Sequence, residues 1–140
     1  MLRVAIDSNI FFSAFTKPGG AASQLLRLAE EQKFRLGVPK YSILELEQVF
    51  VDKKLEDAYM ELVQWVKDNA EEIVLPRGKI LNRYKDYAID IWDIPVIASA
   101  IEWNADYFIT GNIIHFAKEK VEQHLKMFTI RDFLKMFEDI

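Results

Sequence analysis

The sequence predicts an α/β fold, a doubly wound sandwich in which helices cover both faces of a mainly parallel sheet. Short apolar runs recur along the chain, as is typical of strands that are buried on both faces. Longer segments with apolar residues at helical spacing alternate with these runs. The chain has 140 residues and shows no internal repeat, low-complexity tract or linker. We therefore expect one domain over residues 1–140.

In the first half of the chain, Gly and Pro residues mark boundaries between the expected elements. The apolar run at 2–6 predicts the first strand, and Pro18, Gly19 and Gly20 precede the first segment with helical spacing. In chain order, the pattern predicts a strand at 2–6, a helix at 23–32, a strand at 34–38, helices at 40–52 and 55–71, and a strand at 73–75.

In the second half, residues 77–92 carry mixed charges and tyrosines and predict no clear element. A helix is expected at 94–103, because Pro95 suits a first turn, where its missing N–H is not needed. The remaining elements are a buried strand at 107–110, a helical turn at 112–120, a strand at 125–128 and a closing helix at 130–137.

Composition and charge exclude several classes of protein. The chain has no cysteine, which excludes disulfides, thiolate metal sites and a cysteine nucleophile. No apolar run is long enough to cross a bilayer, and Asp7 comes too early for a signal peptide, so we expect a cytoplasmic protein. The formal net charge of −4 argues against a general nucleic-acid coat protein, yet it is compatible with a nuclease whose carboxylates recruit cations.

Polar residues follow the strands at the edge of the sheet where ligands bind in open parallel sheets. Asp7 follows the first strand, Asn112 the strand at 107–110, and Asp90 and Asp93 precede the helix at 94–103. Crowded carboxylates repel one another, and a hard divalent cation such as Mg²⁺ or Mn²⁺ relieves this repulsion through oxygen ligands. A metal bound there activates water and stabilises charge on a phosphate, so the pattern favours phosphodiester cleavage.

Each of these residues also has an ordinary structural interpretation. Asp7 and Asn112 are typical turn residues, and Asp93 is well placed to cap its helix. The helix at 40–52 carries two candidate glutamates, and its pattern does not show which one belongs to the site. A helical wheel puts Glu47 near the buried stripe and Glu45 almost opposite, with the stripe formed by Ile43, Leu46, Phe50 and Val51.

Four segments in order resemble the motifs of PIN domains. Residues 4–14 (VAIDSNIFFSA) resemble the opening motif, an apolar strand running into Asp-Thr/Ser-Asn. Residues 41–50 (YSILELEQVF) are similar to the second motif in a register that matches Glu45. Residues 93–100 (DIPVIASA) resemble the third, and residues 105–112 (ADYFITGN), followed by His115 and Phe116, the last. The closest likeness is to prokaryotic VapC-like toxin components of toxin–antitoxin pairs.

The resemblance implies a three-layer α/β/α fold with a central, mainly parallel sheet and an endoribonuclease that depends on Mg²⁺ or Mn²⁺. It gives metal-ligand roles to Asp7, Glu45 and Asp93. Asn112 joins the catalytic set where many members have a fourth Asp, which leaves the second metal position open. Three residues are expected to orient the Asp7 carboxylate without binding the metal themselves: Ser8, Asn9 and Thr110. Asp106, at the start of its strand, is interpreted as structural.

The resemblance also implies partners: an RNA substrate, a cognate antitoxin and a second copy in a homodimer. Trp65, Trp92 and Trp103 are candidates for an interface, with core packing expected for at least two of them. Two alternatives stay open. The first is a non-catalytic PIN-like module that binds RNA or protein, favoured by Asn112; the second is a phosphotransferase acting through Asp7, disfavoured because Asn9 replaces its second Asp.

Overall fold

A computed structural model describes residues 1–138, in which five parallel strands form one sheet in the order β3-β2-β1-β4-β5. The strands are β1 (Arg3–Ile6), β2 (Arg35–Pro39), β3 (Glu71–Ile73), β4 (Tyr107–Ile109) and β5 (Lys126–Phe128). Every neighbouring pair is parallel, which confirms the predicted sheet and puts β1 at its centre.

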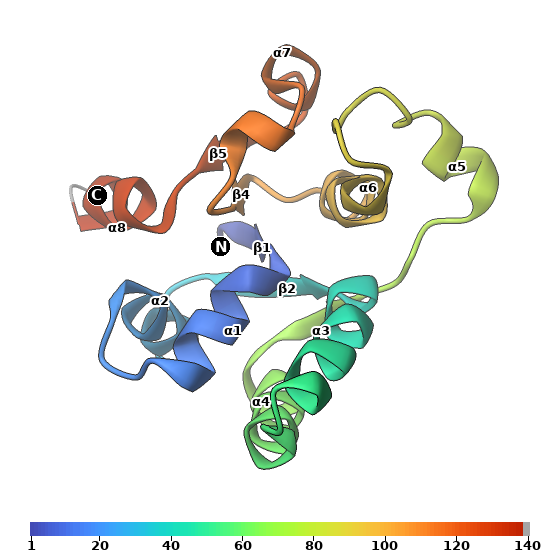
Figure 1. Cartoon of the computed structure of the whole chain (residues 1–140). Coiled ribbons are helices and arrows are strands. Elements are labelled where there is room, and N and C mark those ends of the chain that lie inside the picture. Colours follow the sequence, from blue (N-terminus) through green and yellow to red (C-terminus); the bar gives the residue numbers. More distant parts are fainter. Residues whose placement is uncertain (139–140) are drawn as a thin grey trace.

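Helices cover both faces of the sheet, so the predicted three-layer α/β/α sandwich is confirmed (Figure 1). The α-helices are α1 (Ser8–Thr16), α2 (Ala21–Glu30), α3 (Lys40–Asp52), α4 (Glu56–Asn69), α5 (Gly78–Asn82), α6 (Ile94–Glu102), α7 (Lys118–Val121) and α8 (Ile130–Glu138). Two short 3₁₀ helices are η1 (Ile91–Asp93) and η2 (Ile113–His115). Helices α1 to α4 lie on one side of the sheet, and α5, α6 and α7 on the other.

Alternate residues of each strand enter two different cores. In β1, Val4 and Ile6 pack among α1 to α4, whereas Ala5 packs in the core beneath α6. In β4, Ile109 joins the first core and Phe108 the second. Helix α8 covers the first face as well, because Phe133 is fully buried in that core. Burial on both faces is the reason that the strands have continuous apolar sequences.

Most predicted elements are confirmed, and the misses have physical reasons. Helix α1 was not predicted, because five of its nine residues are apolar and they leave no clear polar face to mark a helical period. The strand expected at 73–75 was wrong by two residues: β3 is Glu71–Ile73, and Val74 is 80% exposed. Val51 was also wrongly assigned to the buried stripe of α3, since it is 43% exposed.

Gly37 marks the closest approach between the sheet and the helical layer above it. A Cβ at this position would lie 2.6 Å from the Trp103 ring and 2.8 Å from Ile73. Glycine is thus required here by the packing of Trp103 across β2. Within residues 1–138, no helix is both long and apolar enough to cross a membrane.

Candidate functional site

Asp7 lies at the carboxyl end of β1, the central strand. Its N–H continues the sheet by donating to the carbonyl of Ile109 at 3.0 Å, and the residue caps α1. Its carboxylate is almost fully enclosed, with 7% of the residue exposed. Oδ1 accepts the Ser8 N–H at 2.7 Å, and Oδ2 accepts the Thr110 hydroxyl at 2.9 Å. The carboxylate is therefore held in a set orientation at the edge of the sheet.

Thr110 connects the ends of two neighbouring strands. Its hydroxyl is fully buried, donates to Asp7 and accepts the Asn112 N–H at 3.1 Å. Because an accepted bond orients the hydroxyl, its proton points at Asp7. Ser8 and Thr110 thus lie where support for Asp7 was expected, whereas Asn9 is exposed on α1.

Glu45 and Asp93 lie near enough to Asp7 for their charges to interact. Burial and then the negative charges of Asp7, Asp93 and Asp90 raise the pKa of Glu45 from 4.5 to about 7. Burial, followed by Asp7 and Asp90, also raises the pKa of Asp93. Burial raises the pKa of Asp7, against the hydrogen bonds from Thr110 and Ser8. The structure therefore groups three of the predicted ligands in one acidic cluster.

The same charges distinguish the two glutamates of α3. Glu45 interacts with the acidic cluster, whereas the charge of Glu47 acts, after burial, on the pKa of Tyr59 from α4. Ile43 and Leu46 face the core, and Glu45 lies on the other side of the helix, where it is exposed and interacts with the charges at the carboxyl edge of the sheet. The helical wheel alone left this choice open, because it shows which residues face the core and not what lies beside the exposed face.

Helix capping does not account for the side chains of Asp93 and Asn112. Asp93 stands at the N-cap of α6 and Asn112 at the N-cap of η2, yet neither side chain makes a capping hydrogen bond. Asp90 does cap, since its Oδ1 accepts the Trp92 N–H at 3.0 Å. The carboxylate of Asp93 and the amide of Asn112 are consequently available for another ligand.

The donor set suits a hard divalent cation. Carboxylate and amide oxygens are the ligands that Mg²⁺ and Mn²⁺ prefer, and a cation would relieve the repulsion that raises the pKa of Glu45. Among the described residues, no group of three or more Asp, Glu, His or Cys side chains lies close enough together to hold a metal ion by itself. Mg²⁺ does not need one, because it usually binds through one or two carboxylates with waters and substrate phosphates.

Two residues beside the acidic cluster were given no role from the sequence. A coulombic interaction with His115 acts to lower the pKa of both Asp7 and Asp93, against the larger effect of burial. Burial and then Glu45, Asp90 and Asp93 raise the pKa of Tyr41. Tyr41 could have been found, since it lies four residues before Glu45 on the same helix face. His115 follows the last motif in the sequence, but its nearness to Asp7 and Asp93 could not be predicted, because it depends on a loop that pairs with the segment around Ala88.

The other sequence predictions concern the molecule's surface and its opposite edge. Asp106 accepts the Arg3 N–H at 2.9 Å at the amino end of β4, which confirms its structural interpretation. Of the three tryptophans, Trp103 is buried, Trp65 is half-buried against Phe11 and Phe15, and Trp92 is exposed. Five basic residues are candidates for contact with RNA phosphates, and all of them are exposed: Lys17, Lys40, Arg77, Lys79 and Arg83.

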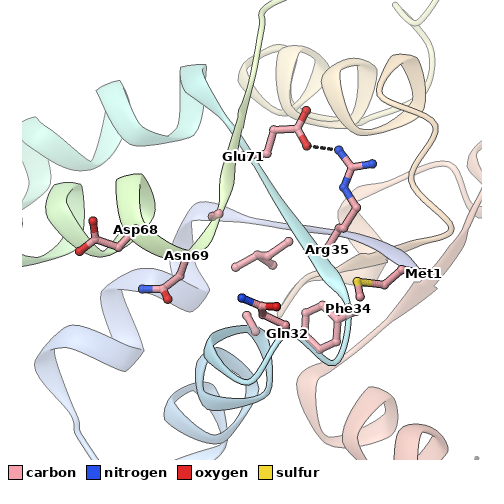
Figure 2. Close-up of a pocket in the computed structure, with 10 residues that line it drawn as sticks. Met1, Gln32, Phe34, Arg35, Asp68, Asn69 and Glu71 are labelled. Atoms are coloured by element: carbon pink, nitrogen blue, oxygen red, sulfur yellow. Dashed lines mark hydrogen bonds and ion pairs between the residues drawn. The ribbon is translucent and has the colours of Figure 1, made fainter.

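A surface cavity of about 280 Å³ lies at the amino edge, away from the acidic cluster. Figure 2 shows Arg35 and Glu71 reaching toward each other at this cavity, with Gln32 and Phe34 nearby. None of the predicted site residues lines it. The chemistry of the carboxyl edge therefore remains the better guide to the functional site.

Comparison with known proteins agrees with this geometry. A model of the PIN domain matches residues 3–114. VapBC2 from Rickettsia felis, solved bound to a promoter DNA fragment, has a chain that is 18% identical with a TM-score of 0.67, covering 91% of this chain and 98% of that one. DNA-bound VapBC from Salmonella typhimurium gives 14% identity and a TM-score of 0.68, covering 93% and 99%.

A third solved structure, VapBC-1 from nontypeable Haemophilus influenzae, gives 15% identity and a TM-score of 0.63 and covers 93% of this chain and 99% of that one. At these identities the likeness shows the fold. A search of curated protein sequences gives no match.

Proposed function

The chain belongs to the PIN-domain family, whose members are generally nucleases that use divalent metal ions, and from this premise we propose that it is an endoribonuclease dependent on Mg²⁺ or Mn²⁺. The observation that carries the proposal is the acidic cluster at the carboxyl edge of the sheet. Asp7, Glu45 and Asp93 come from three distant segments. Burial raises the pKa of all three, and the charge of Asp7 further raises the pKa of Glu45 and of Asp93.

In this proposal Asp7, Glu45 and Asp93 hold the metal. A bound divalent ion supplies positive charge that lowers the pKa of a water and stabilises the phosphate as negative charge develops on it. Asp7 is the anchor, because Ser8 and Thr110 hold its two oxygens. Asn112 contributes an amide oxygen without charge, and the Thr110 hydroxyl fixes its backbone through the Asn112 N–H.

The reaction is hydrolysis of an RNA phosphodiester by in-line attack. The water oxygen bonds to phosphorus, the bond from phosphorus to the 3′ oxygen breaks, and a proton ends on that oxygen. The products are a 5′-phosphate and a 3′-hydroxyl. Asp93 is suited to the site because its carboxylate makes no helix-capping hydrogen bond.

The test is cleavage of a labelled single-stranded RNA by the purified protein with Mg²⁺ or Mn²⁺. We expect cleavage that stops in EDTA and is lost in Asp93→Asn. Glu47→Gln is the matched control, since Glu47 lies on the same helix as Glu45 but its charge acts on Tyr59, not on the cluster. Cleavage that survives Asp93→Asn would overturn the site assignment.

Asn112 favours a second candidate, a non-catalytic PIN-like module that binds RNA or protein, because it removes one charge from the position where many family members have Asp. Calorimetry separates the two. Binding of Mn²⁺ that weakens in Asp7→Asn supports the nuclease, and absence of divalent-ion binding supports the module.

We further propose that the protein is the toxin of a toxin–antitoxin pair, with a cognate antitoxin and a homodimeric assembly. The support is the fold shared with chains of the VapBC structures from Rickettsia felis and Salmonella typhimurium and of the FitAB structure, each solved with DNA. A short neighbouring gene whose product binds this protein and inhibits its cleavage is the expected finding. An isolated gene would contradict the toxin role and leave the nuclease proposal standing.

A further inference from the structure

Trp92 is the tryptophan of this chain that the fold does not bury. It is 64% exposed, whereas Trp103 is 9% exposed and Trp65 packs edge-on against Phe11 and Phe15. Large aromatic side chains usually contribute their area to a core or to an interface. An indole left in solvent directly before Asp93, one of the proposed metal ligands, therefore requires an explanation.

The backbone holds Trp92 in place beside the acidic cluster. It lies in η1, where Asp90 accepts both the Trp92 N–H at its Oδ1 and the Asp93 N–H at its carbonyl, each at 3.0 Å. The preceding segment is fastened to η2, because Ile89 N–H donates to the His115 carbonyl at 2.9 Å and Ala88 forms an antiparallel bridge with Phe116. The indole thus stands on a hydrogen-bonded support and not on a free loop.

Three isoleucines in the same two segments are exposed as well. Ile89 is 82% exposed, Ile91 69% and Ile114 83%, and Ile89 and Ile114 come from the two segments that pair beside the site. The acidic residues Asp90 and Asp93 alternate with them along the chain. The exposed apolar side chains and the carboxylate of Asp93, a proposed metal ligand, therefore lie in the same part of the carboxyl edge.

We propose that Trp92 stacks on an unpaired nucleobase of the RNA next to the phosphodiester that is cut. This inference rests on the proposed nuclease function and adds a residue that binds the single-stranded RNA beside the proposed metal ligands. Consecutive Cα atoms are about 3.8 Å apart, so the backbone of Trp92 lies within the span of one nucleotide from that of Asp93. A base inside a duplex keeps its face against its neighbours and cannot reach the indole.

The charge of the chain favours a base as the occupant. Acidic residues outnumber basic ones, 22 to 18, and Glu45, Asp90 and Asp93 act together at this edge. Contacts between basic side chains and phosphates, which usually supply most of the affinity for nucleic acid, are opposed here. Stacking does not depend on charge, is tolerant of sequence and contributes strongly to binding of single strands. Stacking on Trp92 therefore contributes binding affinity at an edge where the negative charges repel the phosphates.

The first arm of the test is steady-state cleavage of a single-stranded RNA by Trp92→Leu, which keeps an apolar side chain, and by Trp92→Phe, which keeps an aromatic ring. We expect KM to rise about tenfold in Trp92→Leu, with kcat within about twofold, and Trp92→Phe to stay near the parent. Val74→Ala is the matched control, because Val74 is 80% exposed beyond the edge strand β3. Unchanged cleavage by Trp92→Leu, or an equal loss in both variants, overturns the proposal.

The second arm measures binding without cleavage, in the Asp93→Asn background with Mg²⁺ and an eight-nucleotide single-stranded RNA. Stacking should quench tryptophan fluorescence, the quenching should vanish in Trp92→Phe, and the same RNA in a duplex should give none. If the parent protein cleaves no RNA, the nuclease proposal fails, and this arm alone decides the stacking. Absence of quenching, or a change of self-association in Trp92→Leu by sedimentation with RNA binding intact, overturns it in favour of a protein interface.

Discussion

The two edges of the sheet use their charged residues in opposite ways. At the amino edge, Glu71 forms an ion pair with Arg35, and Asp106 accepts the N–H of Arg3. Burial acts to raise the pKa of Glu71, but the interactions with Trp103 and then with Arg35 lower it below its ordinary value. The side chains of Arg3 and Arg35 also lie over the Trp103 ring, 4.3 and 5.9 Å from its centre. Charges at this edge stabilise the fold.

At the carboxyl edge, the pKa values of Asp7, Glu45 and Asp93 are all raised, with burial as the largest cause. None of the three takes part in an ion pair within residues 1–138. Keeping carboxylates together in this way lowers stability, and such arrangements are concentrated at functional sites. Both edges carry acidic residues, but the pKa of Glu71 is lowered at the structural edge, whereas the pKa values at the functional edge are raised. The direction of the shift therefore distinguishes the two edges better than the number of acidic residues does.

The largest effect should come from removing one carboxylate at each edge. Asp93→Asn is expected to lower RNA cleavage at least about a hundredfold with little loss of stability, because a lost metal ligand removes charge stabilisation worth several kcal/mol. Asp106→Ala should do the reverse, lowering the free energy of unfolding by about 1 kcal/mol through the lost hydrogen bond to Arg3. Cleavage assays and urea unfolding on both variants measure this. Equal activity in the two would remove the distinction between the edges.

Thr110→Val tests how far the functional edge depends on a single hydroxyl. The substitution leaves the Asn112 N–H without its acceptor and Asp7 without a donor, which should lower the free energy of unfolding by about 1–3 kcal/mol. Cleavage per folded molecule should fall as well, because Asp7 loses its orientation. Thr110→Ser keeps the hydroxyl and is expected to retain most of both properties. A Val variant as active as the Ser variant would show that the hydroxyl is dispensable.

Gly37→Ala tests the packing beneath the structural edge. The new Cβ would lie 2.6 Å from the Trp103 ring, so the ring or the strand must shift, at a cost of about 1–3 kcal/mol. Gly78→Ala is the matched control, because nothing lies within 4 Å of its Cβ position. Thermal unfolding should separate the two, while cleavage per folded molecule stays at the parent level in both. A loss of cleavage per folded molecule in Gly37→Ala alone would show that packing around Trp103 also affects the functional edge, contrary to this prediction.

The sequence was sufficient for much of the fold because its strands are buried on both faces. Continuous apolar runs and Gly or Pro boundaries located β1, β2, β4 and β5, and Lys40–Asp52 was predicted with both its ends as α3 has them. It was insufficient for β3, whose three residues owe their position to pairing with β2 and not to their own pattern. Short edge strands carry too little local signal to fix a register.

The candidate site shows the same division. Asp7 could be placed from its strand, and the family motif chose Glu45 where the helical wheel could not. The wheel describes one helix, whereas the reason for Glu45 lies in Asp7 and Asp93, which approach it from other segments. Trp92 illustrates a further limit, because the sequence does not show which of the three tryptophans the fold leaves exposed.

The smallest expected effect tests the electrostatics of the functional edge directly. Because folding raises the pKa of Glu45 from 4.5 to about 7, the native state binds more protons than the unfolded state between these values. Stability contributed by this group is therefore fullest below about pH 4.5 and falls as pH rises through about 7. Glu45→Gln removes the dependence, so in EDTA at pH 7.5 the variant should melt about 1–3 °C above the parent, with solvent screening keeping the gain small.

At pH 4.5 that difference should nearly vanish, because the parent carboxyl is then largely neutral. Mg²⁺ or Mn²⁺ at pH 7.5 should raise the melting temperature of the parent more than that of Glu45→Gln, since binding to the native state adds stability in proportion to affinity. Glu47→Gln should follow the parent under all three conditions. If Glu45→Gln melts below the parent in EDTA at pH 7.5, the glutamate stabilises the fold, and the carboxyl edge is no different in kind from the amino edge.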